Sequence, residues 1–342
     1  MSANRGIYKI LSCLRNYHYK PRLLIKLIDT LIKPIALYCC EIWGGFGIKM
    51  NASIDSLICQ LLDSEKTPYE KINIRASKIA LHLNSKVTNI GSRGELGRYP
   101  FSIDIIVAVL KYYARLHSFA AGSLMNNAMH SQCLAKANFG NTIPYPDLCK
   151  RILHHFDFDE TSIPYEGGKS QRKLFGQKLK ILLKNKYSIL FLNKLNVISQ
   201  ENSGKLLLYS KIKNTFTYNK YLDTKNAVAL TKIRLSNHWF PIERDRYKRP
   251  LVLRENRVCT LCNSNNIGDE IHCMLSCLSD KIQILKKNLF EELLSISKQF
   301  KFLFNKPTIL LPYLLKGHDN ILVPKIISWC QKCNDIFKNV DN

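Results

Sequence analysis

Four residues in the last third of the chain have the types and spacing of a metal site. Cys259 and Cys262 are separated by two residues, and His272 and Cys277 follow a turn-forming stretch. Two thiolates two residues apart can bind one side of a zinc ion, and a His and a Cys on the next turn can complete a tetrahedron. The pattern predicts Zn²⁺ bound by Cys259, Cys262, His272 and Cys277. Since four protein ligands leave no open position for a reactive water, the zinc is expected to be structural.

The fourth ligand has a competitor in Cys273. Its place directly after His272 makes it sterically poorer than Cys277. Unrelated buried thiols and a hydrogen-bonded histidine are the alternative interpretation, but the ordered pattern within 19 residues favours a metal. Asp269 and Glu270 are expected to orient the histidine as hydrogen-bond acceptors.

The remaining cysteines do not suggest a disulfide scaffold. Twelve cysteines in 342 residues would fit one only in a much shorter chain. Cys330 and Cys333 form a second CxxC pair without a following His or Cys, so we expect them to pack inside a helix. Basic residues interrupt any N-terminal signal sequence, and the apolar stretch 23–43 carries four charges, too many for a membrane span. We expect an intracellular protein, in the nucleus and/or cytoplasm, with reduced thiols.

The charge of the chain predicts a polyanionic partner. Lys and Arg number 51 against 26 Asp and Glu, which gives a net charge of +25. Such an excess suits nucleic acid or an anionic membrane surface. Residues 168–257 hold 21 Lys or Arg and five acids, interleaved with aromatic residues. Lysines bind phosphates and aromatic rings can stack on unpaired bases. A solvated helix face explains any single residue, but the excess in the whole segment predicts a nucleic-acid-binding surface.

The elements that must position these residues are helices. Apolar residues recur at helical spacing through most of the chain, which predicts a mainly α fold. In the first 45 residues Pro21 is expected to begin a second helix, Pro34 to kink it, and Gly44 to end it. Further helices are expected at residues 55–62, 72–83, 103–116, 170–195, 202–222, 281–304 and 321–339.

Blocks of sequence then suggest a family. Residues 31–44 read LIKPIALYCCEIWG and residues 94–100 read GELGRYP. The blocks 203–206, 234–238 and 241–247 read SGKL, RLSNH and PIERDRY, just before the Cys-Cys-His-Cys pattern. In this order they resemble the region from the thumb to the zinc knuckle of LINE-type (non-LTR) retrotransposon reverse transcriptases. The resemblance covers most of residues 1–280.

The resemblance and the helical pattern together divide the chain into consecutive regions. We expect helical thumb-like and linker bundles, a small zinc-knuckle module and C-terminal helices. Their expected bounds are 1–117 for the thumb-like helical region, 118–170 for the linker, 171–258 for the basic helical region, 259–277 for the zinc knuckle and 278–342 for the C-terminal helices.

The resemblance also implies what the chain does not do. Members of the family polymerise with a palm whose carboxylates, including an Asp-Asp pair, hold two metal ions. This chain contains no adjacent Asp-Asp, and the resemblance begins downstream of the palm. We therefore expect a non-catalytic C-terminal fragment, a remnant that binds RNA and/or DNA. A full-length retrotransposon protein is a further implied partner; neither a membrane nor a small-molecule substrate is expected.

The cations most suited to contact phosphates lie in the basic region. They are Lys205, Lys211, Lys213, Arg234, Arg244, Arg246, Lys248 and Arg249. The alternative is a protein–protein scaffold or a domesticated transposon-derived protein, whose C-terminal helices dock a partner and whose charge only solubilises it. Clustering of the last four cations on the surface beside the zinc site would favour nucleic acid, and internal pairing would favour the scaffold.

Overall fold

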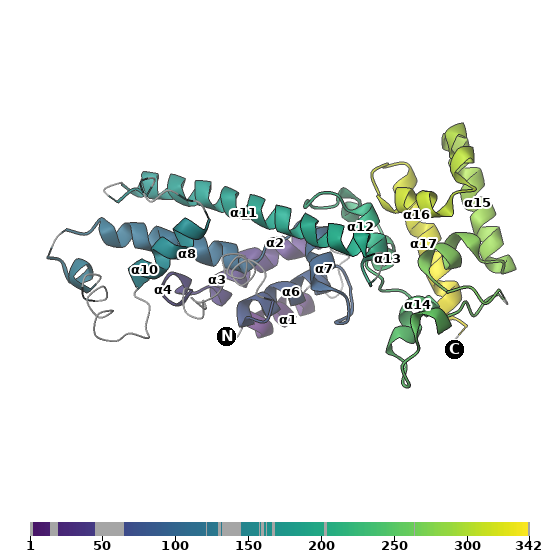
Figure 1. Cartoon of the computed structure of the whole chain (residues 1–342), viewed down its shortest axis with the longest axis horizontal. Helices are drawn as coiled ribbons and strands as arrows, with labels where there is room; N and C mark the ends of the chain where they lie inside the picture. Colours follow the sequence, from purple (N-terminus) through teal and green to yellow (C-terminus); the bar gives the residue numbers. More distant parts are fainter. Residues whose placement is uncertain are drawn as a thin grey trace. The chain divides into compact units, whose positions relative to one another are not determined.

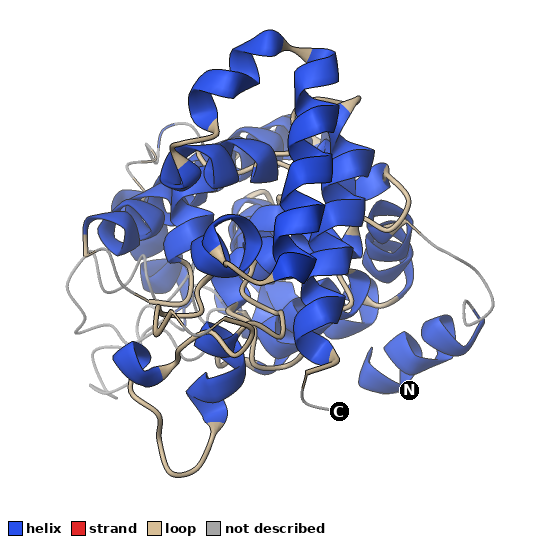
Figure 2. Ribbon diagram, turned by 90° about the vertical axis from the view of Figure 1, so that its right-hand side faces the viewer, coloured by secondary structure: helices blue, strands red, loops and turns tan. Residues whose placement is uncertain are grey.

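The computed structural model describes the chain in several stretches, with gaps between them. The described residues are 3–13, 20–44, 65–120, 122–128, 131, 145–156, 158, 161, 163–165, 168–201, 204–262 and 264–340. Within these stretches the chain forms helices and no β-strand (Figures 1 and 2), with isolated bridges from Leu96 to Tyr218 and from Val258 to Ile267. The predicted mainly α fold is confirmed. None of the described helices combines the length and the apolar composition needed to cross a membrane.

The helices vary from single turns to one of 32 residues. In chain order the elements are α1 (Ala3–Cys13), α2 (Pro21–Leu31), α3 (Lys33–Ala36), α4 (Cys40–Trp43), α6 (Pro68–Ala80), α7 (Asn89–Leu96), α8 (Phe101–His117), α10 (Tyr145–His155), α11 (Lys169–Gln200), α12 (Leu207–Ile212), η2 (Lys220–Asp223), α13 (Val228–Arg234), α14 (Pro241–Arg244), η3 (Asp245–Tyr247), η4 (Arg254–Asn256), η5 (His272–Ser276), α15 (Asp280–Ile296), η6 (Lys298–Leu303), α16 (Pro307–Leu315) and α17 (Leu322–Lys338).

The chain folds into two compact units built from interleaved segments. Unit 1 comprises Met1–Arg15, Leu27–Arg75 and Tyr99–Leu190, and unit 2 comprises Asn16–Lys26, Ala76–Arg98 and Phe191–Asn342. The five consecutive regions expected from the sequence are therefore not separate compact bodies. The metal-ligand pattern, the C-terminal helices and the basic region after residue 190 share one unit, because packing joins segments that are distant in sequence.

Helix α8 forms the centre of unit 1. Its buried side chains include Ile106, Val109 and Leu110, and α4 and α10 pack against it. The Tyr145 hydroxyl of α10 lies 2.9 Å from the backbone oxygens of both Glu41 and Val109, which share its single proton as acceptors. These bonds fix α10 to α4 and α8.

Helix α10 corrects the predicted linker. Residues 145–155 lie within the expected linker 118–170, yet they form a regular helix in which Leu148, Ile152 and Leu153 are buried. Pro146 lies in the first turn, where its missing N–H is not needed. The prolines around this position obscured the helical period in the sequence.

Three other helix predictions need correction. The helix predicted at 281–304 is instead α15 and the short helix η6, separated by the extended residue Ser297. The N-terminal pattern is broken more often than the single predicted kink, because α2 ends at Leu31, α3 follows, and α4 begins only after Cys39, whose φ is 53°. The single helix predicted at 202–222 is instead α12 and η2, separated by irregular chain. The helix predicted at 55–62 lies outside the described residues.

In unit 2, helix α17 packs against α13, α15 and α16. Cys330 and Cys333 are fully buried on α17, so the prediction that this CxxC pair is part of the packing is confirmed. Helix α7 lies very close to its neighbours: a Cβ atom on Gly94 would lie 2.5 Å from the Tyr209 hydroxyl and 2.6 Å from the Phe191 ring.

Candidate metal centre and the basic surface beside it

The metal-ligand pattern folds as a short loop held by backbone hydrogen bonds. The Cys259 N–H donates to Asn266 O at 2.9 Å, and the Gly268 N–H donates to Arg257 O at 2.8 Å. The chain then enters the π-helical turn η5, which begins at His272. These bonds turn the chain back on itself and bring the CxxC pair opposite the histidine.

The four predicted ligands meet at one point. The ligand atoms of Cys259, Cys262, His272 and Cys277 all lie within 4.8 Å of one another. The sulfurs of Cys259 and Cys277 are 3.7 Å apart, and Cys262 Sγ lies 3.3 Å from His272 Nε2. Three sulfurs and one imidazole nitrogen arranged in this way could hold a metal ion.

The structure also separates the two candidates for the fourth ligand. Cys277 belongs to the cluster, and its N–H donates to His272 O at 2.7 Å, which returns the chain to the ligands. Cys273 is buried next to the cluster, and hydrogen bonding from its thiol lowers the pKa of Cys259. Cys273 is thus a neighbour of the ligands, and the sequence-based preference for Cys277 agrees with the geometry.

The electrostatics of the cluster favour the thiolate form of Cys262, but they oppose the ligand forms of His272 and Cys277, which are a neutral imidazole and a thiolate. Hydrogen bonding with Cys259 raises the pKa of His272, despite burial, while the pKa of Cys262 is lowered by hydrogen bonds that outweigh its burial. Burial raises the pKa of Cys277 to about 12. Because a metal binds the thiolate, filling the site must release the Cys277 proton.

Of the two acids before the histidine, only Asp269 contacts it. Asp269 Oδ1 accepts the backbone N–H of His272 at 2.8 Å. The expectation for Glu270 is wrong: its Oε1 accepts from the Ser236 hydroxyl at 3.2 Å and lies 3.1 Å from His238 Nε2. We call residues 257–277, which carry the four predicted ligands, the metal module. Glu270 therefore joins the metal module to the chain after α13.

The metal module also holds the basic segment 241–249 in place. The Ile242 N–H donates to Gly268 O at 3.0 Å, and a Cβ on Gly268 would lie 2.7 Å from Pro241. The Arg257 guanidinium donates to the backbone oxygens of Ile242 and Val252. Helix α14 and the turn η3 are thus positioned by the same short loop that carries the ligands.

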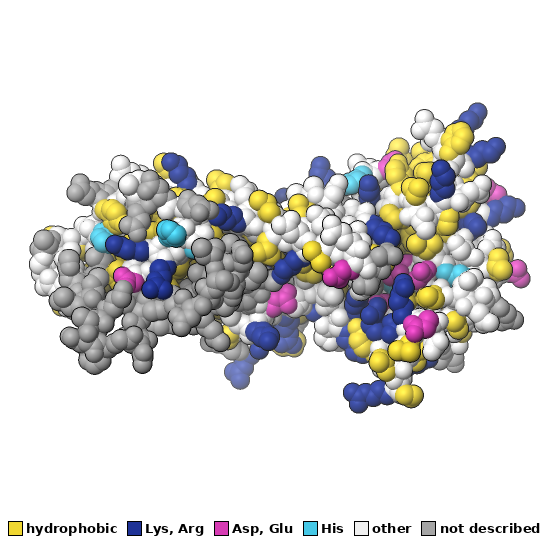
Figure 3. Space-filling model, in the orientation of Figure 1, with side chains coloured by type: hydrophobic (Ala, Val, Ile, Leu, Met, Phe, Trp, Pro, Cys, Tyr) yellow, Lys and Arg dark blue, Asp and Glu magenta, His cyan; other side chains and the backbone are white. Residues whose placement is uncertain are grey.

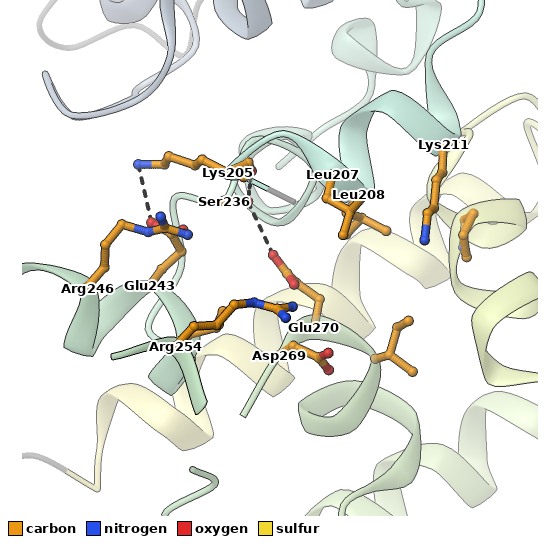
Figure 4. Close-up of a pocket in the computed structure, with 14 residues that line it drawn as sticks. Lys205, Leu207, Leu208, Lys211, Ser236, Glu243, Arg246, Arg254, Asp269 and Glu270 are labelled. Carbon is orange, nitrogen blue, oxygen red and sulfur yellow. Dashed lines mark hydrogen bonds and ion pairs between the residues drawn. The ribbon is translucent and has the colours of Figure 1, made fainter. Parts of the chain in front are cut away.

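Four of the predicted phosphate contacts share two carboxylates, those of Glu243 and Asp245. Glu243 pairs with Lys205 Nζ at 3.3 Å and with Arg246 Nη2 at 2.7 Å (Figure 4). Asp245 pairs with both Arg244 Nε and Lys248 Nζ, each at 2.8 Å. Figure 3 likewise shows acidic side chains among the Lys and Arg side chains around the position of α14.

Two of the predicted phosphate contacts are wrong, because they lie in the core. Arg234 is 1% exposed, and its guanidinium is used by Glu95 and by the backbone oxygen of Leu315. Lys213 is 5% exposed and donates to Thr217 O at 2.8 Å. Neither cation can reach a phosphate outside the protein.

Fewer cations remain on the surface than the sequence predicted. Lys211 and Arg249 are exposed, as is Arg254, which is not among the predicted phosphate contacts. Lys205, Lys211, Arg246 and Arg254 line one pocket together with Glu243, Asp269 and Glu270 (Figure 4). Its volume of about 60 Å³ holds a few water molecules and no nucleotide. Any long polyanion must therefore bind across the surface.

No protein-family model, curated protein or solved structure matches the chain. The resemblance of the sequence blocks to a retrotransposon family stays a prediction. The function of the site is inferred from its own geometry and chemistry.

Proposed function

We propose that the chain is a non-catalytic nucleic-acid-binding protein whose basic surface in unit 2 is held by a structural Zn²⁺. The observation that carries the proposal is the sharing of carboxylates among the cations. Among the described residues Lys205, Arg244, Arg246 and Lys248 pair with two acids, Glu243 and Asp245, so these six side chains together carry two excess positive charges. Exposed Lys211, Arg249 and Arg254 add to them. This excess positive charge would bind phosphates of a nucleic acid and release their counterions.

Zinc is the metal that suits the cluster best. Three thiolates and one imidazole form a Cys₃His set, which typically binds zinc tetrahedrally. Sulfurs about 2.3 Å from a tetrahedral zinc lie about 3.8 Å apart. The separation of 3.7 Å between Cys259 and Cys277 agrees with this value. The role proposed for the ion is to hold residues 257–277, and with them the segment 241–249.

The origin and the lack of catalysis belong to the same proposal. The blocks 31–44, 94–100 and 234–247 support descent from a retrotransposon reverse transcriptase, and the chain carries no adjacent Asp-Asp that could serve as palm carboxylates. Such a remnant would bind RNA or DNA without copying it, and a full-length retrotransposon protein is a natural second partner. Primer extension by this chain would contradict this part of the proposal.

The test is binding of the full chain to fluorescent RNA and DNA by anisotropy at several salt concentrations. For six phosphate contacts, log K should fall with log salt with a slope of about −4 for single strands and about −5 for duplex DNA. Replacing Lys211, Lys248 and Arg249 by Gln should make the slope less negative. The matched control replaces Lys281, Lys287 and Lys301, which are also exposed. Failure to bind either RNA or DNA at ~50 mM salt would rule the proposal out.

The second candidate function is a protein–protein scaffold. The observation in its favour is the internal pairing of Arg244, Arg246 and Lys248, which reduces the charge available beside the metal cluster. In that case the charge only solubilises the chain. The scaffold predicts no affinity for RNA or DNA at ~50 mM salt, so the same titration decides between the two functions.

A further inference from the structure

A second basic surface lies in unit 1 and includes none of the eight cations predicted to contact phosphates, although Lys169 and Lys173 belong to the basic segment 168–257. It is a groove of about 770 Å³ between α8 and the beginning of α11. We call it the α8–α11 groove and define it by Lys111, Tyr112, Arg115, Lys169, Arg172 and Lys173.

The two helices that form the α8–α11 groove contact each other at two places. Lys180 of α11 pairs with Asp104 of α8 at 2.6 Å. Gly176 of α11 lies against the Lys111 side chain, since a Cβ at that glycine would be 2.6 Å from Lys111 Cδ. The absence of a side chain at Gly176 therefore leaves room for the stem of Lys111 beside α11, and Lys111 is one of the residues that line the groove.

The described residues that line the groove carry mostly positive charge. Its lining includes five cations and one carboxylate, that of Glu41. Lys111, Lys169 and Lys173 are exposed, and among the described residues none of them forms an ion pair. Lys111, Arg115, Lys169 and Lys173, brought together in this way, repel one another, and a bound polyanion relieves that repulsion.

The floor of the groove adds an aromatic surface. Tyr112 is partly exposed and lies edge-on to the Tyr145 ring, with ring centroids 6.2 Å apart. Tyr145 is itself held by hydrogen bonds to α4 and α8. A supported aromatic ring bordered by cations is the combination that binds single-stranded nucleic acid, because the ring stacks on a base while the cations bind its phosphates.

We propose that the α8–α11 groove binds a single strand of RNA or DNA, with its phosphates at Lys111, Arg115, Lys169 and Lys173 and a base against Tyr112. The volume, within the range of known ligand pockets, suits roughly two nucleotides. This inference rests on the proposed nucleic-acid-binding function and assigns a second, independent surface to it.

The test compares the full-length chain with a triple variant, Arg115→Gln, Lys169→Gln and Lys173→Gln, using ~12-nucleotide single strands. Affinity at ~50 mM salt should fall on the order of 30- to 100-fold, and the salt slope should become less negative by about 2. The matched control, Lys281→Gln, Lys287→Gln and Lys301→Gln, removes the same charge elsewhere and should stay within about twofold of the wild type. Thermal unfolding of both variants checks that they fold.

A separate variant tests the base contact. Tyr112→Leu keeps an apolar side chain but removes the ring, so it should lower single-strand affinity by about tenfold and leave the salt slope unchanged. If the wild type binds single strands and the triple variant binds them as tightly as the control variant does, the α8–α11 groove is not a binding site, and the proposed function stands. If the wild type binds no nucleic acid, both the assignment of the groove and the proposed function are wrong. The assignment is also overturned if the triple variant loses affinity for duplex DNA or anionic vesicles but keeps its affinity for single strands.

Discussion

Arg234 and Glu95 form a buried ion pair across 139 residues of sequence. Arg234 Nε and Nη2 donate to Glu95 Oε1 at 3.0 and 2.9 Å, and both side chains are 1% exposed or less. Burial alone would raise the pKa of Glu95, yet Arg234 and Lys213 hold it below its usual value. Glu95 comes from the GELGRYP block and Arg234 from the RLSNH block. Two of the blocks that suggested a family are therefore joined in the core of unit 2.

Breaking this pair should destabilise unit 2 strongly. Arg234→Met leaves the Glu95 carboxylate buried without its partner, which costs about 3–5 kcal/mol. The control is Lys325→Met, since Lys325 pairs with Glu292 near the surface at 3.4 Å, and exposed pairs contribute about 0–1 kcal/mol. Urea unfolding measures both. Equal losses in the two variants would show that the buried pair contributes no more than the surface pair.

Lys213 should make the stability of unit 2 depend on alkaline pH. Burial lowers the pKa of Lys213 from 10.5 to about 8. Between these values the unfolded chain binds more protons than the folded chain, so stability should rise with pH across this window. The rise due to this lysine is on the order of 3 kcal/mol.

The measurement is the difference between the wild type and Lys213→Met in urea titrations from pH 7.5 to 10.5. The variant lacks the group, so its stability should increase less than that of the wild type. Parallel profiles for the two proteins would contradict the lowered pKa.

Metal content should distinguish the cysteines of the module. Cys262→Ser removes a ligand and should lower the zinc content of the purified protein, while Cys273→Ser should leave it unchanged. Binding of a structural zinc contributes on the order of 10 kcal/mol to a small module. A chelator should therefore speed hydrogen exchange at the N–H groups of Cys259 and Gly268, which are hydrogen-bonded in the loop. Loss of zinc from Cys273→Ser alone would reverse the ligand assignment.

Gly97 should be intolerant of any side chain. Its φ is 57°, and a Cβ would lie 2.5 Å from the Tyr218 N and 2.7 Å from the Thr217 carbonyl carbon. Gly97→Ala should cost about 1–2 kcal/mol for the left-handed backbone, and the backbone clash should add to this cost. Gly204→Ala is the control, because Gly204 has φ 92° with nothing within 4 Å of its Cβ position. If denaturation experiments show similar losses in the free energy of unfolding for the two variants, the close approach of Tyr218 and Thr217 to Gly97 is unimportant.

The helical character and the metal-ligand set were readable from the sequence because both depend on local chemistry. Helical periodicity is a property of neighbours three and four residues apart, and α8 and α17 lie close to the positions that it predicted. The ligand spacing is similarly local, since Cys259 to Cys277 span one loop and one turn. Helix α10 was missed because the prolines at its beginning are also typical of a linker.

Only the tertiary structure decided whether each cation is buried or exposed. Arg234 and Arg249 are indistinguishable as basic residues in the sequence, but one meets Glu95 in the core and the other lies on the surface. The α8–α11 groove likewise exists only because packing places Lys111 beside Lys169. A side chain's charge is set by its type, whereas its solvation and its partners depend on residues that folding brings from far along the chain. The sequence thus determined how much positive charge the protein carries, and the fold determined which of the charged side chains are exposed on the surface.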